Sequence, residues 1–174
     1  MSAAGTIYVE EPTLIENNFI GNNHGVFKIY STGYLYMNGG IIRNNKGCNS
    51  NGVVIGLYSG NFIMNGGLIT QNYGLNGVAN GRNAAVYVHR NSTFIMNGGE
   101  ISNNIGGSAG GVDSQNNTVI TINDGKIINN YTSNPKYQYH ADININGTAN
   151  INGGEFTQNI DVNIVEEGCA PFKY

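Results

Sequence analysis

Short runs in which apolar residues occupy alternate positions recur along the chain, and each run ends at a cluster of Asn and Gly. The segment FIMNGG at 62–67, repeated at 94–99, places Phe and Met two residues apart before Asn-Gly-Gly. Alternation over a few residues predicts a half-buried β-strand, and Asn and Gly mark tight turns. No run places apolar residues at i, i+3, i+4 and i+7, so the pattern predicts an all-β fold.

The same segment recurs at long, nearly regular intervals. Copies begin at Tyr34, Asn61, Thr93, Val119 and Thr148, with a degenerate copy from Pro12. Their anchors are 27, 32, 26 and 29 residues apart: Met37, Met64, Met96, Ile122 and Ile151. Such a period is typical of solenoids, in which each repeat packs on the next. We therefore expect a right-handed parallel β-helix of about six coils of roughly 23–32 residues, with three short strands per coil.

Stacking of equivalent residues predicts three interior columns and one polar column. The interior columns are Leu35, Phe62, Phe94, Ile120 and Ala149; Met37, Met64, Met96, Ile122 and Ile151; and Ile42, Ile69, Ile101, Ile127 and Phe156. The polar column is an Asn ladder of Asn22, Asn45, Asn72, Asn104, Asn130 and Asn159. Its amides would hydrogen-bond from coil to coil and satisfy backbone groups of the turns.

The repeats indicate one domain over residues 1–174. We assign 1–12 to an N-terminal strand or cap, 13–164 to the coils, and 165–174 to a C-terminal tail or cap. The final coil exposes unpaired strand edges unless it is capped, so the rods could also stack end to end into a filament.

Insertions fall mainly between the ladder Asn and the next Val-rich strand, so they should emerge along one edge of the rod. Such an edge is often the binding face of a repeat protein. Its aromatic, Arg and His side chains would suit a sugar or a protein partner; they are Tyr73, Arg82, Tyr131, Tyr137, Tyr139 and His140. Loops without a binding role are the alternative interpretation.

Alternation also predicts an apolar stripe on the outside of the rod. Its members are Tyr36, Ile63, Ile95, Phe27, Val54 and Tyr87. An outward apolar stripe is unusual for a solitary soluble protein. A terminal segment, a second copy or a neighbouring domain would cover it.

Composition excludes several partners. Charged residues make up 11% of the chain, with eight Lys and Arg and a net charge of -3, which argues against nucleic-acid binding. No apolar run approaches 18 residues, so we expect no membrane-spanning helix. The start lacks the features of a secretion signal.

Cys48 and Cys169 lie far apart, without a C-x-x-C pair. This spacing argues against a zinc site and leaves two free thiols or, outside the cell, a disulfide. We expect no cofactor and no metal.

One constellation could serve catalysis. Asp113 and Asp142 would lie on adjacent coils, with His89 and Arg90 one coil below. Carboxylates near a basic residue are the groups that polysaccharide lyases and hydrolases use. No specific catalytic motif accompanies them, so the noncatalytic interpretation is favoured.

The repeat also resembles known families. The cores FIGN, IRNN, ITQN, ISNN, IINN and FTQN resemble the F-x-x-N repeats of chlamydial polymorphic membrane proteins. The phrase FIMNGG-x-I-x-x-N resembles repeats in large bacterial and archaeal surface proteins of the pectate-lyase-like β-helix superfamily. The resemblance covers about Gly5 to Ile164 and departs from the glycine-rich G-G-A-I element at AAGTIYV and AAVYV. It implies an extracellular adhesin, passenger or structural module.

These observations predict a noncatalytic, extracellular or cell-surface module with an adhesive or structural role. Its expected partners are further copies of itself, other surface proteins or glycans. The alternatives are a polysaccharide-active or carbohydrate-binding β-helix and a trimeric fibre like a phage tail spike.

Overall fold

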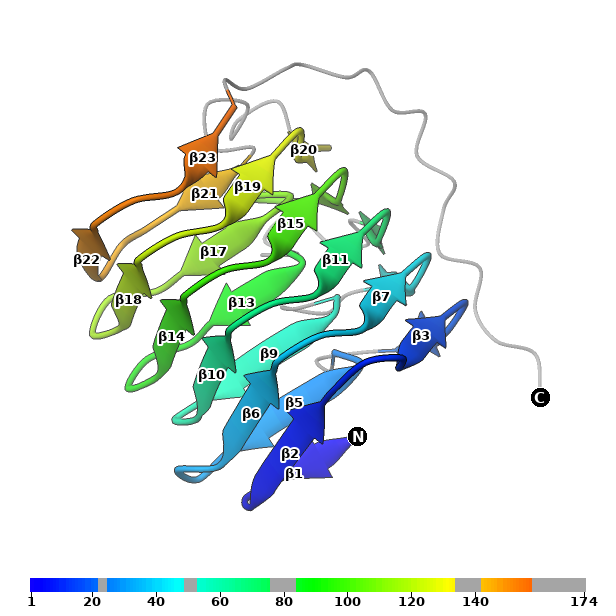
Figure 1. Ribbon diagram of the computed structural model, residues 1–174, viewed down its shortest axis with the longest axis horizontal. Coiled ribbons are helices and arrows are strands. Elements are labelled where there is room, and N and C mark those ends of the chain that lie inside the picture. Colours follow the sequence, from blue (N-terminus) through cyan, green and yellow to red (C-terminus); the bar gives the residue numbers. More distant parts are fainter. Residues whose placement is uncertain (22–24, 49–52, 76–83, 134–141, 158–174) are drawn as a thin grey trace.

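Every regular element in the described part of the protein is a short β-strand. The computed structural model describes residues 1–21, 25–48, 53–75, 84–133 and 142–157, and within these ranges all strand pairs are parallel and no residue is helical. Accordingly, no helix in the described part is long and apolar enough to cross a membrane. The predicted all-β, parallel solenoid is confirmed (Figure 1).

The strands form four sheets, which we call A to D. Sheet A comprises β1 (Ser2–Ala3), β5 (Phe27–Tyr30), β9 (Ile55–Tyr58), β13 (Val86–Val88), β17 (Val112–Ser114) and β21 (Ile143–Asn144). Sheet B comprises β2 (Thr6–Val9), β6 (Tyr34–Met37), β10 (Asn61–Met64), β14 (Thr93–Met96), β18 (Val119–Ile122) and β22 (Thr148–Ile151). Sheet C comprises β3 (Leu14–Glu16), β7 (Ile41–Arg43), β11 (Leu68–Thr70), β15 (Glu100–Ser102), β19 (Lys126–Ile128) and β23 (Glu155–Phe156). Sheet D comprises β4 (Phe19–Ile20), β8 (Lys46–Cys48), β12 (Tyr73–Leu75), β16 (Ile105–Gly106) and β20 (Tyr131–Thr132).

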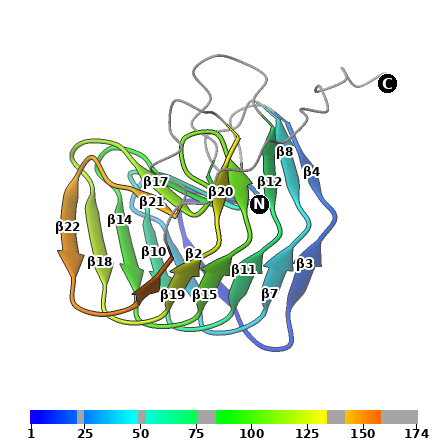
Figure 2. The same cartoon turned by 90° about the horizontal axis from the view of Figure 1, so that it is seen from above.

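Sheet D corrects the prediction of three strands per coil. Its strands follow the Asn ladder directly, and Figure 2 shows sheets B, C and D on successive sides of the rod. Its strands contribute Gly47, Gly74 and Gly106 at equivalent positions. Strands of two or three residues, three of which contain a Gly, show no visible alternation, so their sequences are typical of loops.

The three predicted interior columns are present in the predicted register. Phe62 pairs with Leu35 and Phe94, and Met64 with Met37 and Met96. These side chains are fully buried and form one core cluster. The last members of the columns are exposed, because they lie at the end of the stack: Ala149, Ile151 and Phe156.

Asn-Gly-Gly makes the corner between sheets B and C. The second Gly has a positive φ, for example +86° at Gly99, and a Cβ there would lie 2.7 Å from Met64 Cε. An L-residue at this position would therefore be strained and would collide with the core. This double requirement explains why the last Gly recurs in every copy, including Asn-Asp-Gly at 123–125.

The outward assignment of Phe27 and Val54 was wrong. Phe27 pairs with Ile55, which pairs with Val86, and Phe27 and Val54 both lie in the core cluster. The prediction aligned the Val-rich strands out of register, and a one-residue slip exchanges the two faces of a strand.

The N-terminal residues belong to the solenoid itself. β1 pairs with β5 and β2 pairs with β6, so residues 2–9 supply strands to sheets A and B. The predicted tail at 165–174 lies outside the described residues.

Candidate functional site

A ladder of buried Asn side chains follows sheet C. Asn45 donates through Nδ2 to Oδ1 of Asn72 (2.9 Å), Asn72 to Asn104 (2.9 Å), and Asn104 to Asn130 (3.0 Å). Each Oδ1 also accepts the backbone N–H of the preceding rung, and all four side chains are buried. The ladder therefore satisfies backbone donors and acceptors that strand pairing leaves over.

Both ends of this buried ladder differ from the prediction. Asn18 is the first rung, because Glu16 pairs with Arg43 and Asn18 donates through Nδ2 to Asn45 Oδ1 (2.8 Å). The last rung is Asp142, whose Oδ1 accepts from the N–H and Nδ2 of Asn130 at 2.9 and 3.0 Å. The predicted end members, Asn22 and Asn159, lie outside the described residues.

A second Asn ladder, which the sequence reasoning missed, runs along the exposed corner between sheets B and C. Here Asn65 donates through Nδ2 to Asn38 Oδ1 (2.7 Å), and the same contact repeats through Asn97, Asn123 and Asn152. Asn38 in turn donates to Oε1 of Glu10 (2.6 Å). The signal was available: these residues are the first letter of Asn-Gly-Gly or its equivalent in each repeat.

The two aspartates proposed for catalysis have different surroundings. Asp113 is 0% exposed, and its Oδ2 and Oδ1 accept from Ser108 Oγ (2.6 Å) and Asn144 Nδ2 (2.8 Å). Asp142 is 3% exposed, ends the buried ladder through Oδ1, and accepts from Thr157 N and Oγ1 through Oδ2. Asp113 pairs with Asn144 rather than with Asp142. Both carboxylates thus hold local structure together.

His89 and Arg90 follow β13, on the coil before Asp113. His89 packs against Tyr58 and Tyr87, with ring centroids 5.3 and 6.1 Å apart. Tyr87 pairs with Asp113. Its two neighbours in β13 point into the core, so alternation turns the Tyr87 side chain outward. It is nevertheless almost fully buried. Arg90 is exposed and donates through Nε to Asn116 Oδ1 (2.9 Å). The structure places His89 directly after β13, the strand that pairs with the strand of Asp113, and places the Asp142 carboxylate on the buried ladder.

The outer face of sheet B carries three of the six residues of the predicted outward stripe; the prediction of an exposed stripe was wrong for Tyr87 as well, because this residue of sheet A is only 1% exposed. Tyr36 pairs with Ile63 and Ile63 with Ile95, and all three are partly exposed. Tyr8 extends this column at the N-terminal end; it is 61% exposed and stacks on Tyr36 at 5.2 Å between ring centroids. Tyr34, two residues before Tyr36 on β6, also stacks on Tyr36, at 6.0 Å between ring centroids.

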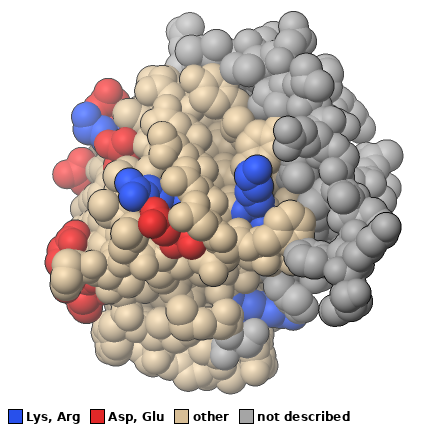
Figure 3. All heavy atoms as spheres, turned by 90° about the vertical axis from the view of Figure 1, so that its right-hand side faces the viewer, with Lys and Arg blue, Asp and Glu red and all other residues tan. Residues whose placement is uncertain are grey.

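None of the six strands of sheet B contains a charged residue. Their outward positions carry Tyr, Ile, Val, Thr and Asn, and the exposed ladder follows at the end of each strand. Elsewhere the surface is more mixed: on the face drawn in Figure 3, basic and acidic side chains are interspersed among uncharged ones. Sheet B is therefore a distinct, uncharged surface.

Sheet D brings together two of the predicted binding residues. Tyr73 and Tyr131 both pair with Ile105, so the three form one column on consecutive strands, each partly exposed. Phe19 and Lys46 continue this column toward the N-terminus. The other predicted binding residues lie outside the described part: Arg82, Tyr137, Tyr139 and His140.

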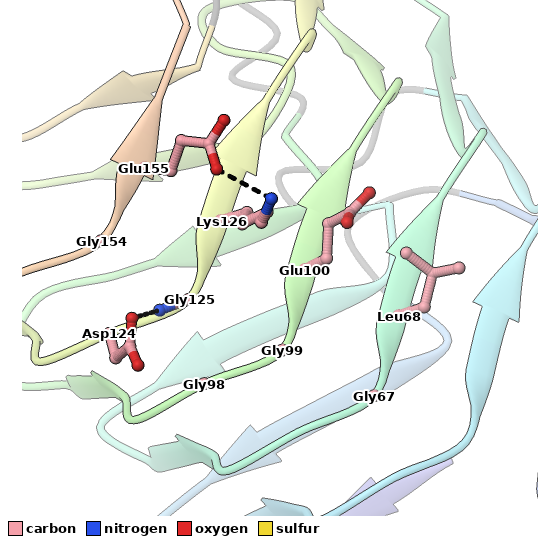
Figure 4. Close-up of a pocket in the computed structure, with 10 residues that line it drawn as sticks. All are labelled: Gly67, Leu68, Gly98, Gly99, Glu100, Asp124, Gly125, Lys126, Gly154 and Glu155. Carbon is pink, nitrogen blue, oxygen red and sulfur yellow. Dashed lines mark hydrogen bonds and ion pairs between the residues drawn. The ribbon is translucent and has the colours of Figure 1, made fainter.

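A groove of about 680 Å³ lies beside the exposed ladder, where the glycine corners leave the surface hollow (Figure 4). Its wall carries Glu100, Lys126 and Glu155 on consecutive strands of sheet C. Lys126 Nζ lies 2.8 Å from Glu155 Oε2, and this hydrogen bond, together with the charges of Glu155 and Glu100, raises the pKa of Lys126 above its usual 10.5. The groove has no aromatic residue in its lining.

Neither a metal site nor a comparison with known proteins indicates the function. Among the described residues, no group of three or more His, Cys, Asp or Glu side chains is arranged to hold a metal ion. Comparison with protein-family models, with curated proteins and with solved structures gives no match.

Proposed function

We propose that this protein is a noncatalytic, adhesive β-solenoid module of a cell surface, and that it binds its ligand with the outer face of sheet B. The observation that carries the proposal is the absence of charge from all six strands of that sheet. Depletion of charge and enrichment in Tyr distinguish the centre of binding interfaces from the rest of a protein surface.

A neutral glycan is the partner class that we favour. Tyr8, Tyr34 and Tyr36 offer aromatic surface and phenol hydroxyls, and Ile63 and Ile95 extend the apolar strip. Each amide of the exposed ladder uses one N–H and one lone pair within the ladder, so a second N–H and lone pair stay available for ligand hydroxyls. An acidic glycan would find no cation on this face.

The extracellular location and the family belong to the same proposal. The F-x-x-N and MNGG repeats resemble those of bacterial surface proteins, which supports a surface location. We also infer a right-handed solenoid of about six coils, because crossover connections between parallel strands of one sheet are almost always right-handed and three of the sheets hold six strands each.

Binding to immobilised neutral and acidic polysaccharides tests the proposal. We expect Tyr36→Ala and Ile95→Lys to weaken binding to a neutral glycan by about tenfold or more, the effect of losing a central interface residue. Tyr131→Ala, a matched change on sheet D, should leave it unchanged. No reducing ends should form during incubation.

Three results would contradict the proposed adhesive function. Binding that survives both changes on sheet B but is lost in Tyr131→Ala would move the site to sheet D. Release of reducing ends would make the protein a polysaccharide-active enzyme. A trimeric mass in solution with sheet B protected from solvent would favour the fibre alternative.

A further inference from the structure

The exposed Asn ladder consists mainly of a dipeptide that can react with itself. Its rungs are exposed, and all but Asn123 are followed directly by Gly: Asn38, Asn65, Asn97 and Asn152. In an Asn-Gly sequence the backbone nitrogen of Gly can reach the side-chain amide carbon of Asn, because Gly has no Cβ and adopts most backbone conformations. In the buried ladder larger residues follow the rungs, such as Tyr73 after Asn72. The reactive sequence is therefore concentrated on the exposed ladder.

The stacking of the coils favours Gly directly after these rungs. A Cβ at Gly66 would lie 2.8 Å from Asn38 O, and one at Gly98 would lie 2.9 Å from Asn65 O. The backbones of successive corners thus approach each other too closely for most side chains. Asp124 occupies the equivalent position after Asn123, and its Oδ1 accepts from Gly125 N at 2.7 Å. The corner can therefore also be built with Asp at this position.

The two identical copies of FIMNGG differ in one backbone N–H group. Asn65 and Asn97 have the same sequence neighbours from Phe to the second Gly. Gly66 N donates to Met37 O at 3.2 Å, whereas Gly98 N donates to no acceptor in the described part of the chain. A nitrogen must give up its hydrogen bond before it can attack a carbonyl carbon. Gly98 N is therefore the more available nucleophile of the two.

The ladder also polarises the amides that would be attacked. Asn97 Oδ1 accepts from Asn123 Nδ2 at 2.7 Å, and Asn65 Oδ1 accepts from Asn97 Nδ2 at 2.8 Å. Each donor lies at the oxygen on which negative charge develops during attack on the amide carbon, and such a donor stabilises the transition state. Both copies share this activation, so the N–H of the following Gly is what distinguishes them.

We propose that Asn97 is a site of spontaneous deamidation in the folded protein. Gly98 N attacks Cγ of Asn97, the N–Cγ bond forms and the Cγ–Nδ2 bond breaks, and ammonia leaves with the proton of Gly98 N. Water then opens the cyclic imide at either of its carbonyl carbons, which gives aspartate or isoaspartate. The reaction consumes one water and releases one ammonia, without an oxidant or an enzyme.

Deamidation at this rung changes both the ladder and the surface. The product is a carboxylate, which has no N–H to donate to Asn65 Oδ1 and leaves two acceptors facing each other. It also places a negative charge beside sheet B, whose described strands contain no charged residue. The edge of an uncharged surface thus becomes acidic with time.

Incubation of the full chain at mildly alkaline pH tests the proposal, because the glycine nitrogen loses its proton more readily there. Peptide mass spectrometry with detection of isoaspartate identifies each converted site. We expect Asn97 to convert several-fold faster than Asn65 in the folded protein. In urea the two rates should become equal, because the sequences around the two residues are identical. Isoaspartate at Asn97 identifies the route, because it forms only through the cyclic imide.

Two matched variants exchange the corner sequences that the chain already contains. Gly98→Asp makes the corner Asn-Asp-Gly, as at 123–125, and should slow conversion of Asn97 several-fold. Asp124→Gly makes the corner Asn-Gly-Gly and should speed conversion of Asn123 several-fold. Thermal unfolding first compares each variant with the unaltered protein. If Gly98→Asp is unfolded, Asp124→Gly and the comparison of Asn65 with Asn97 decide.

Three outcomes overturn the proposal. The first is equal conversion of Asn65 and Asn97 in the folded protein, which would mean that the corner geometry has no effect. The second is conversion of Asn97 without isoaspartate, which would exclude the cyclic imide. The third is a folded Gly98→Asp variant in which Asn97 converts at an unchanged rate. Glycan binding by sheet B does not enter these measurements, so their failure leaves the proposed adhesive function untouched.

Discussion

At the scale of single residues, neighbouring positions in the Asn doublets have different tasks. The first residue has a left-handed backbone, with φ of 54° at Asn44, 55° at Gln71 and 55° at Asn103. The residue after it supplies the ladder amide. Asn tolerates the left-handed region better than most side chains, so the doublet combines a turn with a rung. Gln71 shows that only the second position requires Asn.

The burial of the two ladders predicts unequal costs for the same substitution. Asn104→Ala removes the acceptor for Asn72 and the donor to Ile69 O (3.0 Å) inside the protein. We expect a loss of about 2–4 kcal/mol in the free energy of unfolding. Asn97→Ala, the matched change on the exposed ladder, should cost less than about 1 kcal/mol because water replaces the lost bonds. Urea denaturation measures both, and equal losses would contradict the assignment.

At the scale of elements, alternation in sheet B separates a core from a surface within four residues. In β14, Phe94 is buried and stacks on Phe62 at 5.1 Å between ring centroids, while the next residue, Ile95, is partly exposed. Identical rings on consecutive strands pack parallel, which favours repetition of the same residue along a column.

Adjacent substitutions in β14 check this assignment. Phe94→Ala should lower the free energy of unfolding by about 3–5 kcal/mol, because it opens a cavity in the core. Ile95→Ala should cost about 1 kcal/mol or less, since its side chain lies on the outer face of the sheet and is partly exposed. Chemical denaturation under the same conditions measures the pair. A larger loss for Ile95 would mean that the register of sheet B is shifted by one residue.

The strands next to the Asn-Gly-Gly turn could be predicted from the sequence, and those farther from this turn could not. Asn-Gly-Gly follows sheet B and precedes sheet C at constant distance, so both registers could be derived. The strands of sheet A have no such marker and vary in distance from it, which explains the misplacement of Phe27 and Val54. Sheet D could not be recognised because Gly47, Gly74 and Gly106 leave each strand only one or two side chains.

At the scale of the whole molecule, the last strand of sheet B differs from the strands in the middle of the sheet. The residues of β10 and β14 are buried or partly buried, whereas all four residues of β22 are exposed. In a repeat protein each coil is stabilised by its neighbours, so a terminal coil loses one of its two interfaces.

Amide hydrogen exchange should reveal this gradient. We expect the slowest exchange in β10 and β14 and exchange faster by at least about tenfold in β22 and β23, because local opening at a stack end breaks fewer contacts. Exchange is carried out on the intact chain, and mass spectrometry of its peptides after proteolysis resolves these strands. Uniform protection along sheet B would mean that the molecule opens only as a unit.

The ladder ends required the structure. Asp142 follows an insertion and is not an Asn, so no alignment of Asn residues would select it. Its role appears only in the contact itself, in which Asp142, directly before β21, accepts the Nδ2–H of Asn130. Glu10 is likewise recognised only when β2 pairs with β6 and places it beside Asn38.

The identical copies at 62–67 and 94–99 have a consequence for the history of the gene. A recombination event between them would delete 32 codons and bring Phe94 onto Leu35, with the corner glycines and both ladder rungs still in register. The reverse event would insert one coil and leave every interface as it was. Recombination between the copies would therefore change the length of the protein by one whole coil while the Phe and Met columns stay in register.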